Sequence, residues 1–200
     1  MRWLLIIAAA IAPSQIAPDA RPRVVLDNAS VRVYRATAGA LAGIEHGPAV
    51  VVSLGDGHGA GAGSAVWVDD VAAPTGASQV RGSIVIVQPC GDGAAPPSAG
   101  SKPGEGAFTG MSFHPILENA RVQVIRARME VGAREGVHTH GSDTIVVHLS
   151  GGAIEDTADG KTVVNRWKRG DVEFEGLGTS HSARNVGGAV DVVLVVLKPR

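Results

Sequence analysis

The sequence predicts an all-β protein made of two tandem jelly-roll-like barrels, of which the N-terminal one is shortened. Three observations predict this class. The apolar segments are short, rich in Val and Ile, and bounded by Gly, Asp and Asn, as strands and hairpins are. Beyond the N-terminal apolar stretch, no segment has the ~3.6-residue period of a helix. A segment of the first half also recurs, with small changes, in the second half.

The expected strands follow the Val- and Ile-rich runs in chain order. Those runs are residues 50–54, 84–87, 122–125, 145–149 and 190–197. With 44% apolar residues the chain can build a core, and its 27 glycines and 11 prolines predict many turns. Cys90 is the single cysteine, so no intramolecular disulfide can form. A net charge of −1 provides no basic surface, which argues against nucleic acid as a partner.

The N-terminal residues have the pattern of an export signal. Met1 and Arg2 precede an apolar run over residues 3–12, which is too short for a membrane span of about 20 residues. We therefore expect a signal peptide over residues 1–20, no stable membrane span, and a periplasmic or secreted protein. The sequence does not decide whether the signal peptide is cleaved after Ala12 or nearer Ala17 or Ala20. A buried N-terminal strand or helix is the alternative.

An internal repeat divides the chain into two halves. Residues 26–36 match residues 117–127 at seven of eleven positions, and residues 50–57 match residues 145–152. The composition predicts a degenerate barrel over residues 23–89, a Gly-, Pro- and Ser-rich linker over 90–111, and a second barrel over 112–199. We expect the shortened first barrel to need the second one to cover its open edge.

Three histidines in the second half are placed as metal ligands. His138 and His140 are two residues apart, so in a strand they point to the same face, with Cα atoms about 6.6 Å apart. Two such imidazoles can converge on one ion. His181 lies in a Gly-rich turn between strand-like runs and can arrive from a neighbouring strand. The first half retains only His46 and, where residues 74–79 align with 176–181, Gln79 at the third position, so we expect no metal site there.

Residues 132–151 and 170–185 resemble the two sequence motifs of the cupin superfamily. The positions that fit the motifs are Gly132, His138, His140, Gly151, Gly170, Gly178, His181 and Asn185. Two positions differ: Thr144 stands where the family has Glu, and Gly176 where it has Pro. With its flanking strands the resemblance covers residues 113–198. It implies a jelly-roll barrel with the histidines holding a metal ion.

The replacement of the family's Glu by Thr144 removes an anionic ligand. Thr144 shares the parity of the histidines, so it should face the ion and could hydrogen-bond to a group bound there, whereas Asp143 should point away. His148 has the same parity but lies about 13 Å beyond Thr144, too far to coordinate. We interpret Glu173 and Glu175, which alternate with apolar residues, as solvated, and leave open that they line the pocket.

A neutral three-histidine site would leave the charge of a divalent metal uncompensated and would favour anionic, chelating ligands. The resemblance implies that such a site can work, because cupin thiol dioxygenases and diketone-cleaving dioxygenases use three histidines. We therefore expect an exported cupin that binds one divalent transition metal, with Fe(II) favoured and Zn, Mn, Ni or Cu open.

The expected function is a mononuclear non-haem metal oxygenase that acts on a small anionic chelating substrate. The alternative is a non-catalytic module that binds a small molecule or metal, and a third interpretation gives the histidines a structural role alone. The sequence identifies no catalytic acid or base. It also leaves homodimerisation open.

Overall fold

The computed structural model describes residues 21–55, 61–73, 80–90 and 107–198, and every regular element in these ranges is a β-strand. This part of the chain therefore contains no helix that could cross a membrane. The predicted signal peptide, Gln79 and most of the predicted linker lie outside the described residues.

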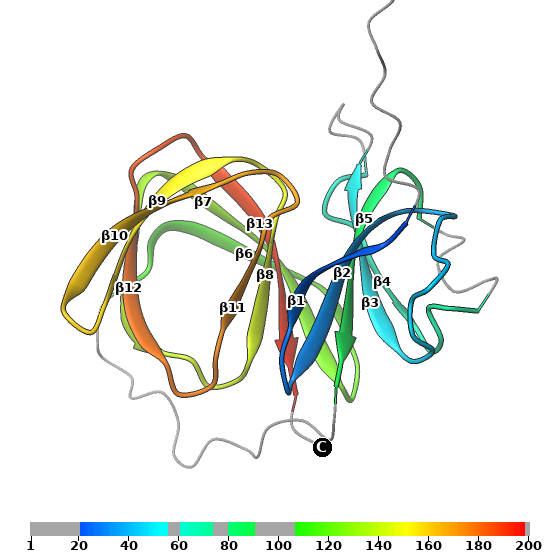
Figure 1. Cartoon of the computed structure of the whole chain (residues 1–200). Coiled ribbons are helices and arrows are strands. Elements are labelled where there is room, and N and C mark those ends of the chain that lie inside the picture. Colours follow the sequence, from blue (N-terminus) through cyan, green and yellow to red (C-terminus); the bar gives the residue numbers. More distant parts are fainter. Residues whose placement is uncertain (1–20, 56–60, 74–79, 91–106, 199–200) are drawn as a thin grey trace, which may run out of the picture.

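The first half forms one five-stranded antiparallel sheet, with the strand order β1-β2-β5-β3-β4 (Figure 1). Its strands are β1 (Arg23–Asp27), β2 (Val31–Thr37), β3 (Ala49–Gly55), β4 (Ala65–Val68) and β5 (Ser83–Pro89).

The second half forms an eight-stranded antiparallel sheet that curls into a barrel (Figure 1). Its strands are β6 (Thr109–Glu118), β7 (Val122–Thr139), β8 (Thr144–His148), β9 (Gly152–Ala158), β10 (Lys161–Trp167), β11 (Val172–Glu175), β12 (Ser180–Asn185) and β13 (Val190–Leu197). The order is β10-β9-β12-β7-β13-β8-β11, and β6 also pairs with β7. The all-β prediction is confirmed. β6 begins within the stretch predicted as linker.

The first half has the strand order of one side of the barrel. Its order β1-β2-β5-β3-β4 corresponds to β6-β7-β13-β8-β11 in the second half. The pairings also correspond, because Val52 lies opposite Ala65 as Val147 lies opposite Val172. The barrel adds β9, β10, β12 and the second part of β7, which have no counterpart among the described strands of the first half. The shortened first unit is thus an open sheet.

The repeated segments fold into the same turn. Asn28 accepts hydrogen bonds from the amides of Ser30 and Val31 through its side chain, at 2.9 and 3.0 Å. Asn119 accepts bonds from Arg121 and Val122 in the same way, at 2.8 and 3.0 Å. This short Asn side chain satisfies two amides that a tight turn leaves without backbone partners.

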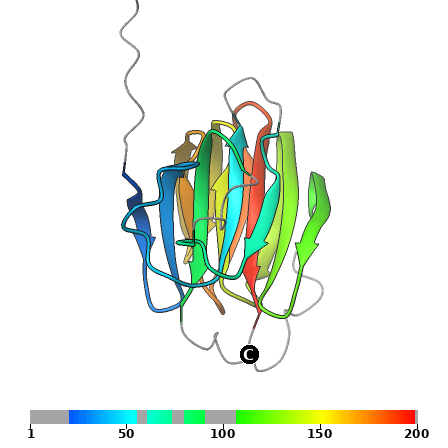
Figure 2. The same cartoon turned by 90° about the vertical axis from the view of Figure 1, so that its right-hand side faces the viewer.

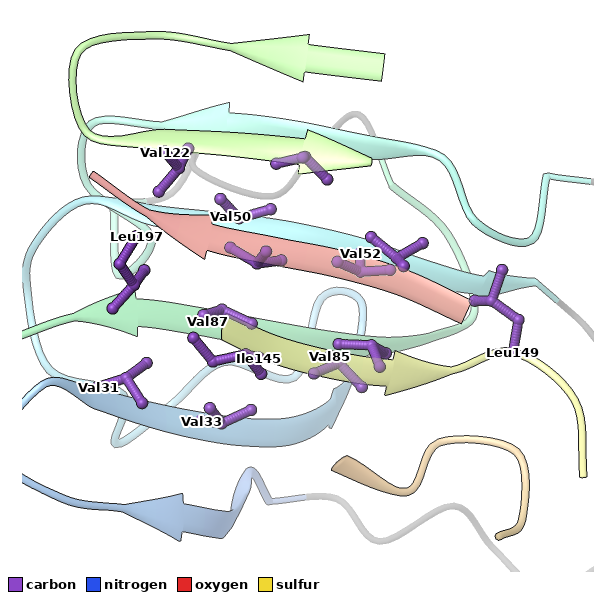
Figure 3. Close-up of a cluster of buried hydrophobic side chains, with 14 of the residues drawn as sticks. Val31, Val33, Val50, Val52, Val85, Val87, Val122, Ile145, Leu149 and Leu197 are labelled. Atoms are coloured by element: carbon purple, nitrogen blue, oxygen red, sulfur yellow. The ribbon is translucent and has the colours of Figure 1, made fainter. Parts of the chain in front are cut away.

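The two halves pack face to face through an apolar core (Figure 3). Both halves contribute equivalent positions to this core: Val31 and Val122, Val33 and Val124, Val50 and Ile145, Val52 and Val147, Leu54 and Leu149, Val85 and Val193, Val87 and Val195. Figure 2 shows the strands of the first sheet in front of the barrel and roughly aligned with its strands, as in a β-sandwich. The barrel therefore covers the face of the first sheet, and not its edge as the sequence led us to expect.

Polar contacts at the rim of this core also come in equivalent pairs, one from each half. Arg35 donates to the carbonyl of Arg169 at 3.4 Å, and Arg126, the equivalent of Arg35, donates to the carbonyl of Ala62 at 3.3 Å. Arg169 additionally donates to the carbonyls of Leu54 and Gly55. The same surface patch is thus used by both halves, as in a symmetric dimer interface.

Candidate metal centre

The three predicted histidines converge inside the barrel. His138 and His140 lie at the end of β7, and His181 lies on β12 directly opposite His138 in the strand pairing. The ring centroids are 4.6 Å apart for His138 and His181, and 4.9 Å apart for each of the other two pairs. The side chains are therefore brought together by one strand pair, as period-2 geometry predicts.

Hydrogen bonds hold two of the rings in one orientation. The Nδ1 atom of His138 donates to the carbonyl of Gly136 at 2.9 Å. The Nδ1 atom of His181 donates to the Asp156 carboxylate at 2.9 Å. Since a carbonyl and a carboxylate only accept, each ring keeps its proton on Nδ1 and leaves Nε2 free as a ligand atom. A carboxylate behind a histidine is the usual partner of metal-ligating imidazoles.

The donor atoms fit a transition-metal ion. One nitrogen from each histidine lies within 4.8 Å of those of the other two. The Nε2 atoms of His140 and His181 are 3.0 Å apart. Two nitrogens bound at about 2.1 Å to the same ion would be about 3.0–3.4 Å apart. These three residues could hold a metal ion with little rearrangement.

A carboxylate lies beside Thr144, the position at which the first motif has Glu and this sequence has none. Strand β11 pairs with β8 so that Glu175 lies directly opposite Thr144. The Glu175 carboxylate is 3.6 Å from Nδ1 of His140 and 4.0 Å from Nε2 of His181. Thr144 faces the cavity, as predicted. A carboxylate thus stands on the adjacent strand, directly opposite the position where the first motif has its Glu.

Further carboxylates surround the histidines. Glu135 lies 3.9 Å from Nε2 of His181, and Asp156 and Glu173 also line the cavity. Burial, followed by the charges of Glu173, Glu135 and Asp156, raises the pKa of Glu175 to about 8. Burial also raises the pKa of Glu135. Burial and the neighbouring rings of His181 and His138 lower the pKa of His140 to about 4.

The interpretation of Glu173 and Glu175 as solvated residues is wrong. Both side chains line the cavity, and Glu175 is only 18% exposed. The alternation was read correctly, but in this barrel Val172 and Phe174 face outward against the first sheet while the glutamates face inward. The outer face of the barrel packs in the apolar core shared with the first sheet, so the polar residues of the pattern point into the barrel cavity. Glu135 and Asp156 carried no recognisable sequence signal.

These carboxylates also change the expected charge of the site. The sequence suggested a neutral three-histidine centre with an uncompensated positive metal. Four carboxylates instead line the same cavity. Burial raises the pKa of both Glu175 and Glu135, and the charges of neighbouring carboxylates add to the rise. A divalent ion bound there would be attracted to these groups.

Asp143 and the remaining motif residues Asn185 and Gly178 stabilise the backbone around the site. Asp143 accepts a hydrogen bond from the amide of Leu177 at 2.7 Å and does not line the cavity, as parity predicted. Asn185 is buried and donates to the carbonyls of Met129 and Gly188 at 3.1 and 2.9 Å. Gly178 adopts a positive φ of 80°, which residues with a Cβ rarely adopt.

The cavity has a volume of about 210 Å³ and is mainly apolar beyond the histidines. Its apolar lining includes Met111, Phe113, Val146, Ile154, Trp167 and Leu194. His148 also lines it, outside the metal triad, as the spacing predicted. A small molecule can therefore occupy the barrel next to an ion.

In the first half, apolar core residues occupy the sheet face that is equivalent to the cavity face of the barrel. Val66 and Val68 stand where the barrel has Glu173 and Glu175, and they pack against a core that includes Tyr34, Val51, Ile84 and Ile86. His46 is exposed and lies 2.8 Å from Asp70 on the surface. Among the described residues, the triad in the barrel is the only group with metal-ligand spacing.

Comparison with known proteins finds similarity to solved structures. The sequence matches no protein-family model. It also matches no curated protein. A cupin domain from Bordetella pertussis Tohama I is 24% identical over 46% of this chain and 97% of its own, with a TM-score of 0.43. A predicted oxalate decarboxylase from Thermotoga maritima is 28% identical over 44% and 81%, with a TM-score of 0.35. An RmlC-like cupin from Shewanella frigidimarina is 20% identical over 46% and 81%, with a TM-score of 0.36.

The two sequence motifs, the jelly-roll barrel of the second half and the histidine triad inside it together define a cupin fold. The prediction from the sequence is confirmed at this level.

Proposed function

We propose that this protein is a metal-dependent cupin in which His138, His140 and His181 bind one divalent transition metal and Glu175 provides a fourth, anionic ligand. The observation that carries the proposal is the convergence of three imidazoles, two of them held through Nδ1, next to a carboxylate-lined cavity. Fe(II) is favoured because mixed imidazole and carboxylate ligands suit it, and Zn, Mn, Ni and Cu accept the same donors.

The cavity beside this centre would hold a small organic ligand. A bound ion would supply Lewis-acid or redox chemistry to a ligand oxygen or sulfur atom. The chain's own contribution is a partly open, mainly apolar cavity, together with Thr144 as a hydroxyl next to the ion. Because carboxylates already surround the ion, a neutral chelating substrate fits better than the anionic one expected from the sequence.

Catalysis of the dioxygenase type is the enzymatic form of this proposal, and a non-catalytic binding module is the alternative. A cavity beside an ion with open positions favours the enzyme, because a ligand in the cavity would contact the ion directly. No residue is assigned as a catalytic acid or base.

Metal analysis followed by oxygen-uptake assays tests the proposal. The full chain, purified without an affinity tag, should contain about one equivalent of metal, and a His138→Ala, His140→Ala double variant should contain none. Oxygen uptake with a panel of neutral chelating compounds in the Fe(II)-loaded protein would support the oxygenase. Bound metal and ligand without uptake would support the binding module. Absence of metal binding would refute the metal centre and leave only a module that binds a small molecule without metal.

We also propose export, which rests on the sequence of residues 1–20, and an origin of the two halves by duplication. The repeated Asn turn and the matched core positions support duplication. Homodimerisation stays a prediction, to be tested by light scattering.

A further inference from the structure

The cavity contains a second polar position at the far end of strand β8. His148 lies four residues beyond Thr144, or about 13 Å along the strand, and faces the same cavity. Its side chain is only 1% exposed. Its ring is stacked on Trp167, with centroids 4.5 Å apart and an interplanar angle of 17°.

Neither ring nitrogen of His148 has a hydrogen-bond partner among the described residues. The Glu173 carboxylate lies 3.8 Å from Nε2, beyond hydrogen-bonding distance. A buried polar group without a protein partner is rare, because leaving it unsatisfied costs free energy. His148 and Glu173 both line the cavity, so a molecule inside it can form hydrogen bonds with them.

The 3.8 Å gap is suited to a hydroxyl group. A hydroxyl can donate one hydrogen bond and accept another, so it can bridge an imidazole nitrogen and a carboxylate that do not reach each other. On β8 and β13, Val146 and its partner Leu194 line the cavity between Thr144 and His148. Along these two strands the cavity is therefore polar near the triad, apolar at Val146 and Leu194, and polar again at His148.

We propose that His148 and Glu173 form a hydroxyl-recognition subsite for the cavity's ligand, which would be a small, mainly apolar molecule with metal-binding oxygens at one end and a hydroxyl at the other. This inference rests on the proposed metal centre for the first end of the ligand. The cavity volume of about 210 Å³ limits the ligand to a single ring or a short chain. Trp167 and Phe113 provide aromatic surfaces suited to a ring.

Matched pairs of catechols test the subsite. The compounds are 4-methyl-, 4-ethyl- and 4-propylcatechol, each paired with the analogue that carries a terminal hydroxyl on the same side chain. Their affinities are measured by calorimetry with the Zn²⁺-loaded full chain, which avoids oxidation. In the wild type, at least one hydroxylated compound should bind about tenfold more tightly than its partner. His148→Phe, which keeps the stacking on Trp167, should abolish that preference without weakening the hydroxyl-free partner. No preference in any pair, or an unchanged preference in the variant, would overturn the subsite.

A second measurement is independent of metal and ligand. In the metal-free protein, His148→Phe should raise the melting temperature by about 2–4 °C, because it removes a buried polar group that no protein atom satisfies. A lower melting temperature for both His148→Phe and His148→Leu would show that the imidazole is structural and would overturn the inference. Failure of the metal proposal would appear differently, as loss of Zn²⁺ binding in the wild type.

Discussion

At the scale of single residues, the proposed ligand Glu175 lies next to the position where the cupin motif has its Glu. Thr144 and Glu175 are direct neighbours across the β8–β11 pair, so their side chains start from adjacent points of the same face. A carboxylate on either residue would project toward the histidines. The position of the acid along the sequence can therefore differ from the cupin pattern while its position in space stays close to it.

Exchange of the two residues tests this relation. Glu175→Gln should weaken metal binding by about tenfold or more, because an anionic ligand becomes neutral. Adding Thr144→Glu to that variant should restore much of the affinity. Glu173→Gln is the matched control, because Glu173 lines the same cavity but its carboxylate lies 3.8 Å from His148 and forms no ion pair with the triad among the described residues. It should have a much smaller effect. The measurement is a competition titration with a chromogenic chelator. If Glu175→Gln leaves the affinity unchanged, Glu175 is not a ligand.

The raised pKa of Glu175 predicts how the stability of the metal-free protein depends on pH. Between about pH 4.5 and pH 8 the unfolded chain loses this proton while the folded chain keeps it, so stability falls as the pH rises. His140, whose pKa is lowered to about 4, has the opposite effect, but only below about pH 6.5. From pH 6.5 to 8 the fall should be up to about 1.4 kcal/mol per pH unit.

Urea denaturation at several pH values in the presence of a chelator measures this fall. Glu175→Gln should flatten it, whereas Glu118→Gln should not, because ion pairing with Lys198 lowers the pKa of that carboxyl. A wild-type stability that is constant from pH 6.5 to 8 would contradict the assigned environment of Glu175.

At the scale of strands, β8 and β11 each serve two environments. Their outward side chains belong to the core shared with the first sheet, and their inward side chains line the cavity. Ile145 on β8 is fully buried in that core although it lies on the outside of the barrel. A substitution there should affect stability and leave the metal site intact.

Ile145→Ala should lower the free energy of unfolding by about 2–5 kcal/mol, since it leaves a cavity between the two halves. Its metal content per folded chain should be unchanged. Val163→Ala on the exposed surface of β10 is the control and should change stability by less than about 0.5 kcal/mol. Equal effects of the two substitutions in chemical denaturation would show that the inter-sheet core is not formed.

At the scale of the whole molecule, the first half acts as a cover for the outer face of the barrel. Both halves contribute equivalent residues to the shared core, and equivalent arginines, Arg35 and Arg126, reach across its rim. This is the geometry of a two-fold dimer joined into one chain. The first half has Val66 and Val68 in place of the barrel's inward-facing glutamates, whereas its interface positions correspond to those of the barrel.

The asymmetry predicts one metal ion per chain. Because the first half has Val66 and Val68 in place of the cavity glutamates and no histidine triad among its described residues, it should not bind metal at comparable affinity. Elemental analysis combined with titration should give one equivalent in the wild type. A second equivalent of similar affinity, or metal retained after His181→Ala combined with the double variant, would contradict this.

The sequence alone determined which segments are strands and which histidines share a face, because side-chain alternation is a local property of an extended chain. Repeat comparison likewise indicated that the first half lacks the triad. Only the tertiary structure decided which face of each strand packs in the apolar core. It turned Glu173 and Glu175 inward, placed Glu175 beside Thr144, and buried His148 without a partner. Alternation specifies two faces but not which one meets a core, since that depends on pairing and packing between segments far apart in the chain.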